Sequence, residues 1–196
     1  MKQETYLPTL QDVRDLASAC SRTAPTGIRN RALVLILAGT GLRISEALAL
    51  RPRDYDQDNG LLRVQIGKGG KHRVVPIGMP EAQEALDRWL ERRSALGITN
   101  HRTVFCTLDG KPMWTSYIRS MLPRLAQKAG IQGRIHAHGL RHFHAATLAQ
   151  AHCPIVHIQN ALGHSSLSTT AVYLKRLAPQ DTFDAVREAF GRVIAE

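Results

Sequence analysis

The chain has 196 residues, 43% of them hydrophobic, and a formal net charge of +10. This length suits one domain with a substantial hydrophobic core. It contains no apolar run of the roughly 18 residues that a membrane-spanning helix needs. It also lacks a signal-peptide pattern at its start, so we expect a soluble, cytoplasmic protein. The three cysteines form no CxxC pair, which argues against a disulfide framework or a thiolate zinc site.

The positive charge is concentrated in one part of the chain. Residues 110 to 180 contain no Asp or Glu but eight Lys and Arg. Because solvated surfaces normally mix both signs, this stretch favours contact with the phosphates of a nucleic acid. The same lack of carboxylates argues against a Mg²⁺ site within it, since Mg²⁺ prefers carboxylate oxygens.

The first half of the chain predicts three helices followed by a hairpin. Helices are expected at 8–21 and 27–38 and, after the GTG break at 39–41, in LRISEALAL, which Pro52 ends. The segments LLRVQI (61–66) and HRVVPI (72–77) are rich in Val and Ile, which is typical of strands. The glycine-rich GKGGK between them predicts a hairpin turn.

The second half is predicted to be almost entirely helical. An amphipathic helix is expected at 80–96, and a short strand, TVFC, precedes the turn DGKP at 109–112. Further helices are expected at about 114–129, 139–150, 154–162, 168–177 and 181–194. The predicted fold class is therefore mainly α with a small antiparallel β-sheet, an α+β domain.

Two motifs in the first half could carry chemistry. In TGLRISE, Arg43 and Glu46 lie at positions i and i+3 of one helix face, so Glu46 could orient the guanidinium. The pair equally fits an exposed ion pair of little energetic consequence. In GKGGK, Lys68 stands between two glycines. It is either a solubilising turn residue or a mobile ammonium that reaches a phosphate or a leaving oxygen.

A histidine-rich motif, HAHGLRHFHAA, stands at a predicted helix start. His138 and Arg141 are again three residues apart, which places an imidazole beside a guanidinium. The same segment spaces four histidines as HxHxxxHxH, and His138 with His142 at i and i+4 could hold Zn²⁺. Zinc binding is a competing hypothesis, weakened by the lack of a nearby carboxylate or CxxC pair and by the neighbouring arginines.

The last motif is LGHSSLSTTAVYLK at 162–175, in which Tyr173 follows His164 by nine residues. A lone tyrosine in an apolar helix is more often a packed side chain than a nucleophile. The other motifs of the chain have to decide between these two interpretations of Tyr173.

In this order the motifs resemble the catalytic domain of the tyrosine recombinases, the family of phage integrases and chromosome-dimer resolving recombinases. The resemblance covers roughly residues 8–180, and it departs from the family pattern at His142-Phe143-His144 and at Ala151-His152-Cys153. Only about 40 residues precede Arg43, so we expect a catalytic domain (1–180) with a C-terminal tail helix (181–196) and no N-terminal core-binding domain. The tail either packs on its own domain or docks into a neighbouring subunit.

The resemblance implies a site-specific DNA recombinase or integrase that cleaves and rejoins DNA through a covalent 3′-phosphotyrosine. Tyr173 would be the nucleophile and Lys68 would protonate the leaving oxygen. The implied catalytic residues are Arg43, Lys68, His138, Arg141, His164 and Tyr173, with Glu46 in support. Further DNA contacts are expected from Lys71, Arg73, Lys111, Arg119, Arg124 and Lys175. No metal or other cofactor is implied.

The implied partner is double-stranded DNA at a specific recombination site, bound by a tetramer built as a dimer of dimers from monomers that are free in solution. Two alternatives keep the fold and change the function. One is a DNA-binding accessory or regulatory protein without productive cleavage, and the other is a strand-passage enzyme like the type IB topoisomerases. A zinc metalloprotein is the last alternative.

Overall fold

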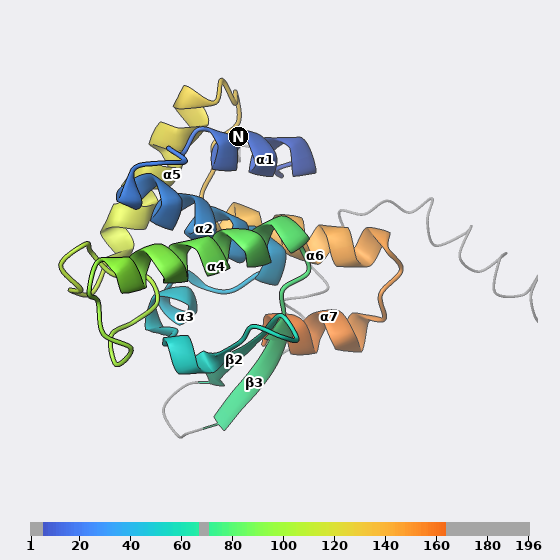
Figure 1. Cartoon of the computed structure of the whole chain (residues 1–196). Helices are drawn as coiled ribbons and strands as arrows, with labels where there is room; N and C mark the ends of the chain where they lie inside the picture. The colour runs from blue at the N-terminus through green and yellow to red at the C-terminus, as the bar shows by residue number, and fades with distance from the viewer. Residues whose placement is uncertain (1–5, 67–70, 164–196) are drawn as a thin grey trace, which may run out of the picture.

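The computed structural model describes residues 6–66 and 71–163, and it shows a group of helices with a small sheet at one side (Figure 1). The predicted fold class is confirmed. In chain order the elements are α1 (Leu10–Ser18), α2 (Pro25–Thr40), α3 (Ile44–Ala49), η1 (Pro52–Asp54), β1 (Tyr55–Asp56), β2 (Leu61–Ile66), β3 (Lys71–Pro76), α4 (Pro80–Ala95), α5 (Thr115–Lys128), α6 (Ala137–Gln150) and α7 (Ile155–Leu162).

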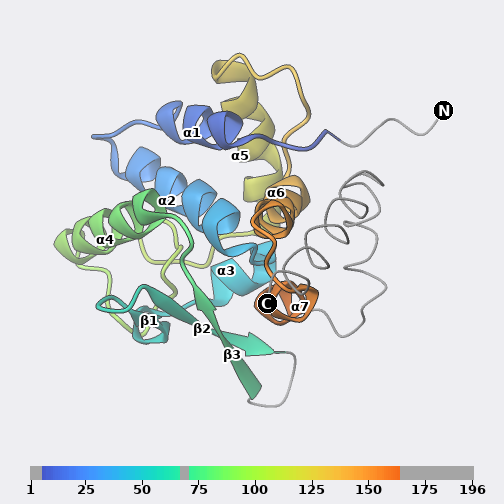
Figure 2. The same ribbon diagram turned by 90° about the vertical axis from the view of Figure 1, so that its right-hand side faces the viewer.

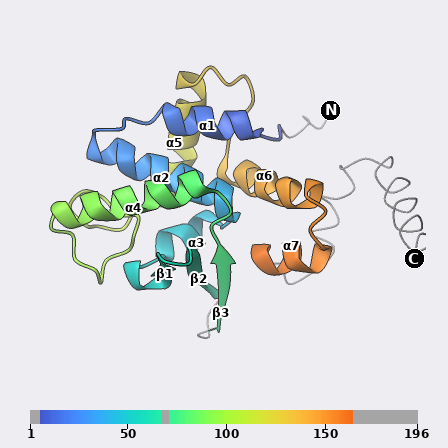
Figure 3. The same cartoon turned by 45° about the vertical axis from the view of Figure 1, so that its right-hand side comes forward.

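Helix α2 is the centre of the hydrophobic core. Its residues 32–38 are at most 1% exposed, which is the all-round burial expected of a helix that is apolar on every face. It packs against α1, α4 and α6 and runs between them (Figure 3). The helix begins two residues before its predicted start because Pro25, with its fixed φ, suits the first helical turn. It ends at Gly41, whose φ of 64° is left-handed.

The sheet has the strand order β1-β2-β3, and both pairings are antiparallel. Leu62 pairs with Val75, and both face the core at 1% and 0% exposure. The two strands of the predicted hairpin are confirmed, whereas its turn at 67–70 lies outside the described residues. Helix α7 lies beside β3, so the end of the described chain returns to the hairpin (Figure 2).

The predicted strand TVFC is wrong. Cys106 makes only an isolated bridge with Pro112. Val104 instead donates its N–H to the carbonyl of Leu50 at 2.7 Å and accepts from the indole of Trp89 at 2.8 Å. The segment is buried, as its apolar residues predict. Its backbone groups form hydrogen bonds with a loop and with side chains, and not with a neighbouring strand. Helix α3 ends at Ala49, and Pro52 begins the short helix η1 after Leu50 and Arg51.

Helix α6 begins two residues earlier than predicted because His136 caps it. The Nδ1 atom of His136 accepts the backbone N–H of Gly139 at 2.9 Å, which satisfies one of the free donors at a helix start. The helices predicted at 168–177 and 181–194, and with them the C-terminal tail, lie outside the described residues. Within the described ranges no helix is long and apolar enough to cross a membrane.

Candidate active site

A cleft of about 280 Å³ brings together three of the predicted catalytic residues. Its walls are the start of α3, the first turns of α5 and the start of α6. The polar side chains that line it are Arg43, Ser45, Thr115, Arg119, His138 and Arg141. The described lining contains no carboxylate, and the N-termini of α5 and α6 add partial positive charge. The cleft therefore has the chemistry of an anion site.

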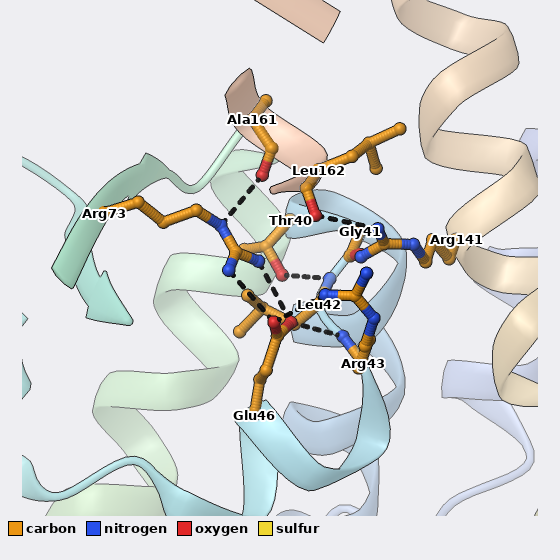
Figure 4. Close-up of polar contacts among 9 residues, drawn as sticks. All are labelled: Thr40, Gly41, Leu42, Arg43, Glu46, Arg73, Arg141, Ala161 and Leu162. Atoms are coloured by element: carbon orange, nitrogen blue, oxygen red, sulfur yellow. Dashed lines mark hydrogen bonds and ion pairs between the residues drawn. The ribbon is translucent and has the colours of Figure 1, made fainter. Parts of the chain in front are cut away.

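Arg141 is the buried cation of this cleft, with 2% of the residue exposed. Its guanidinium donates to the carbonyl of Gly41 and to that of Leu162, both at 2.7 Å (Figure 4). These carbonyls belong to the ends of α2 and α7, where the helix dipoles are negative. A buried charge is thus stabilised by backbone acceptors, and the fork is held in one orientation at the cleft wall.

Arg43 is an exposed cation of the cleft, with 48% of its side chain accessible. It precedes the first turn of α3, and its guanidinium donates to Glu46 at 3.0 Å. The second oxygen of Glu46 accepts the backbone N–H of Arg43 at 2.8 Å. The predicted support of Arg43 by Glu46 is present in the structure, and it fixes both ends of the arginine.

Glu46 has a second and stronger partner in Arg73. The two guanidinium nitrogens of Arg73 reach the two carboxylate oxygens of Glu46 at 2.9 and 3.0 Å (Figure 4). Burial alone would raise the pKa of Glu46, but the hydrogen bonds and charges of Arg73 and Arg43 outweigh it and lower that pKa. The side chain of Arg73 is only 9% exposed. Its burial indicates that Arg73 holds Glu46 in place within the protein. Its predicted contact with DNA stays a prediction.

His138 lies in the cleft beside Arg141 and packs edge-on against His142, with ring centroids 4.3 Å apart. Burial lowers its pKa, and the nearby charges of His136, Arg141 and Arg43 lower it further. The imidazole is therefore neutral at pH 7 and can accept a proton.

The four-histidine array is divided between different surroundings. His136 caps α6, whereas His144 is buried at 8% exposure and its Nδ1 lies 3.2 Å from the carbonyl of Ala38. In the described part of the chain no three His, Cys, Asp or Glu side chains are grouped to hold a metal ion. His144 lies about one turn beyond Arg141 on α6, and the cleft lining does not include it.

The other residues predicted to contact DNA do not all line the cleft. Arg119 lines the cleft, and Lys111 is exposed and paired with Asp109 at 2.7 Å. Arg124 is exposed on α5, where it donates to the carbonyl of Ser120 at 3.1 Å. Lys71 begins β3, and nothing further of its side chain is described. Lys68, His164, Tyr173 and Lys175 fall outside the described residues.

Comparisons with known proteins agree with this geometry. Residues 9–179 match the model of the phage integrase family. The chain is 36% identical over 166 residues to tyrosine recombinase XerC 2 of Ralstonia nicotianae, covering 84% of this chain and 48% of that protein. It is 39% identical over 150 residues to tyrosine recombinase XerC of Xanthomonas campestris pv. campestris (strain B100), covering 76% and 45%. The chain thus spans about half the length of these curated relatives.

Solved structures show the same fold. The crystal structure of XerA recombinase superposes with a TM-score of 0.78 at 31% identity, covering 98% of this chain and 66% of that one. XerH site-specific recombinase bound to difH substrate in a pre-cleavage complex gives 0.73 at 30% identity, covering 86% and 50%. The chain therefore belongs to the phage integrase family, as a tyrosine recombinase catalytic domain.

Proposed function

We propose that this protein is a site-specific DNA recombinase that breaks and rejoins DNA through a covalent 3′-phosphotyrosine. The observation that carries the proposal is the cleft in which Arg43, His138 and Arg141 meet. The guanidinium groups of Arg43 and Arg141, from distant parts of the chain, line it together with the imidazole of His138. Such an arrangement can bind the oxygens of a phosphodiester and stabilise the charge that develops when its phosphorus is attacked. As an enzyme that acts on DNA, it would work in the cytoplasm.

The proposed reaction begins with the scissile phosphate in the cleft. Arg43 and Arg141 bind its non-bridging oxygens, and His164 adds a hydrogen bond as negative charge builds up in the pentacoordinate transition state. The hydroxyl oxygen of Tyr173 attacks phosphorus while its proton passes to the neutral His138. The bond from phosphorus to the 5′ oxygen breaks, and that oxygen takes a proton from Lys68. Rejoining reverses these steps, so the phosphotyrosine conserves the energy of the bond.

The proposed substrate is double-stranded DNA carrying a particular recombination site, bound by four copies of the chain as a dimer of dimers. Similarity to XerH bound to difH substrate supports the DNA partner. The basic stretch from 110 to 180, which includes Arg119 at the cleft, supports it independently.

A nicked duplex that carries the recognition site tests the proposal. Loss of the short fragment after cleavage prevents rejoining, so the wild-type protein should accumulate a DNA adduct that survives SDS. Tyr173→Phe should form none. Tyr55→Phe, which removes a hydroxyl bonded to Asp87 beside the sheet, should form it normally. An adduct that persists in Tyr173→Phe would refute the assignment, and equal cleavage of a scrambled site would indicate a topoisomerase-like activity.

The role of Lys68 can be tested separately with a substrate that has sulfur in place of the 5′ bridging oxygen. A thiolate leaves without protonation because the pKa of a thiol is about 8.5. Lys68→Met should therefore cleave the oxygen substrate slowly and the sulfur substrate at the wild-type rate. Arg43→Lys, the matched control, should stay slow on both, because sulfur does not replace a lost phosphate contact. Failure of sulfur to rescue Lys68→Met would exclude the acid role.

A further inference from the structure

Arg73 lies outside the cleft lining and contacts the carboxylate that holds Arg43 and the backbone beside an acceptor of Arg141. Its guanidinium fork binds both oxygens of Glu46, at 2.9 and 3.0 Å. Glu46 in turn accepts the side chain of Arg43 at 3.0 Å and its backbone N–H at 2.8 Å. Arg73 therefore restricts the carboxylate that restricts Arg43, and it does so from a different element, β3.

The same guanidinium also holds the end of α7. Its Nε donates to the carbonyl of Ala161 at 3.3 Å (Figure 4). It packs so closely on Gly163 that a Cβ there would lie 2.7 Å from it. The next carbonyl along, that of Leu162, accepts from Arg141 at 2.7 Å. Arg73 thus fixes the turn of backbone that supplies one of the acceptors of Arg141.

We propose that Arg73 is a positioning residue of the active site. It holds the acceptors of Arg43 and Arg141 at one spacing by tying β3 to α3 and to the end of α7. This inference rests on the proposed cleavage function. It assigns Arg73 a role in catalysis through other residues, in place of direct contact with DNA.

The physical reason lies in the geometry of the fork. Both oxygens of the Glu46 carboxylate are engaged by two parallel N–H groups, an arrangement that a lysine ammonium cannot reproduce. A lysine at position 73 keeps the positive charge near Glu46, but it lets the carboxylate rotate. Because this carboxylate holds the guanidinium of Arg43, that guanidinium becomes less fixed as well. The Arg73 guanidinium also joins Glu46 to the carbonyl of Ala161, so the end of α7 should loosen as well.

The test compares Arg73→Lys with Arg93→Lys. Arg93 is also a buried arginine, at 1% exposure, and donates to carbonyls of the loop after α4, including Thr99 at 2.7 Å. Both variants should lose stability, but only Arg73→Lys should slow adduct formation at saturating DNA, by about tenfold or more, with the Kd for DNA nearly unchanged. Equal rates for the two variants, measured on folded protein, would overturn the proposal.

A double-mutant cycle identifies the route. Because Arg73 acts on Arg43 through Glu46, the combined loss of rate in Glu46→Gln with Arg73→Lys should be smaller than the product of the two single losses. The part that remains in the Glu46→Gln background measures the effect of Arg73 through the end of α7. Fully multiplicative losses would contradict the link from Arg73 through Glu46 to Arg43.

Amide hydrogen exchange on the free protein makes the test independent of cleavage. Exchange in α3 and in the last turn of α7 should rise in Arg73→Lys and stay at the wild-type level in Arg93→Lys. Unchanged exchange in Arg73→Lys would overturn the inference even if the wild type cleaves DNA. A wild type that forms no adduct, with the exchange result as expected, would instead count against the proposed function and confine Arg73 to holding the fold.

Discussion

Arg141 on α6 donates a 2.7 Å hydrogen bond to the carbonyl of Gly41, the residue that ends α2. Gly41 has a left-handed φ of 64°, and this conformation turns the chain sharply between α2 and the segment that carries Arg43. Gly41 therefore affects the positions of both Arg141 and Arg43. It supplies an acceptor to the buried one and directs the backbone toward the exposed one.

Gly41→Ala should destabilise the protein by more than backbone strain alone. A Cβ at Gly41 would lie 2.7 Å from the ring of His144 and 2.9 Å from Leu162. Gly97 has a similar φ of 72° with nothing within 4 Å, so Gly97→Ala isolates the strain, of about 1 to 2 kcal/mol. Urea unfolding should show a larger loss for Gly41→Ala, and only this variant should slow adduct formation. Equal losses in both assays would show that the contacts around Gly41 are unimportant.

Separate replacements of Arg141 and Arg43 should distinguish an effect on catalysis from an effect on stability. Arg141→Lys leaves buried carbonyls short of a donor and should cost about 1 to 3 kcal/mol of folding free energy. Arg43→Lys changes a side chain that is 48% exposed and should cost little. Both should lower the rate of adduct formation by about 10² or more, because each removes a guanidinium fork that we propose binds the phosphate. Thermal unfolding and single-turnover cleavage check the two halves, and a fully active Arg43→Lys would contradict the assignment.

Burial lowers the pKa of His144 from its ordinary 6.5 to about 4. Between pH 6.5 and about pH 4, His144 is therefore protonated in the unfolded chain but neutral in the folded chain. The folding free energy is not reduced by this difference above pH 6.5, and it falls as the pH drops toward about 4. The loss is at most about 3 kcal/mol.

His144→Phe should flatten this part of the pH dependence, as measured by urea unfolding at pH 4.5, 5.5 and 7. His101→Ala, at an exposed histidine, should leave the wild-type slope in place. An unchanged slope in His144→Phe would show that another group is responsible.

The two tryptophans give a built-in reporter of DNA binding. Trp114 is 78% exposed and precedes Thr115 of the cleft, whereas Trp89 is fully buried and donates to the carbonyl of Val104 at 2.8 Å. DNA that occupies the cleft should change the emission of Trp114 and protect it from acrylamide. Trp114→Phe, which retains only Trp89, should show no change on the same titration. DNA binding detected by anisotropy without any change in Trp114 would place the DNA elsewhere.

The amino-acid sequence predicted the helices of the described residues, the hairpin strands and three residues that the cleft brings together, Arg43, His138 and Arg141. Apolar spacing reports burial directly, and Arg43, Glu46, His138 and Arg141 stand in short motifs whose i, i+3 spacing holds on any helix. The strand at TVFC was predicted wrongly because an apolar run reports burial without saying which groups satisfy the backbone.

Only the tertiary structure decided how these residues are held. The acceptors of Arg141 are backbone carbonyls 100 and 21 residues away, and any residue type could supply them. Arg73 looked like a contact for DNA because positive charge predicts a phosphate partner equally well wherever it lies. Its burial against Glu46 and the end of α7 depends on packing between elements, which sequence spacing does not record.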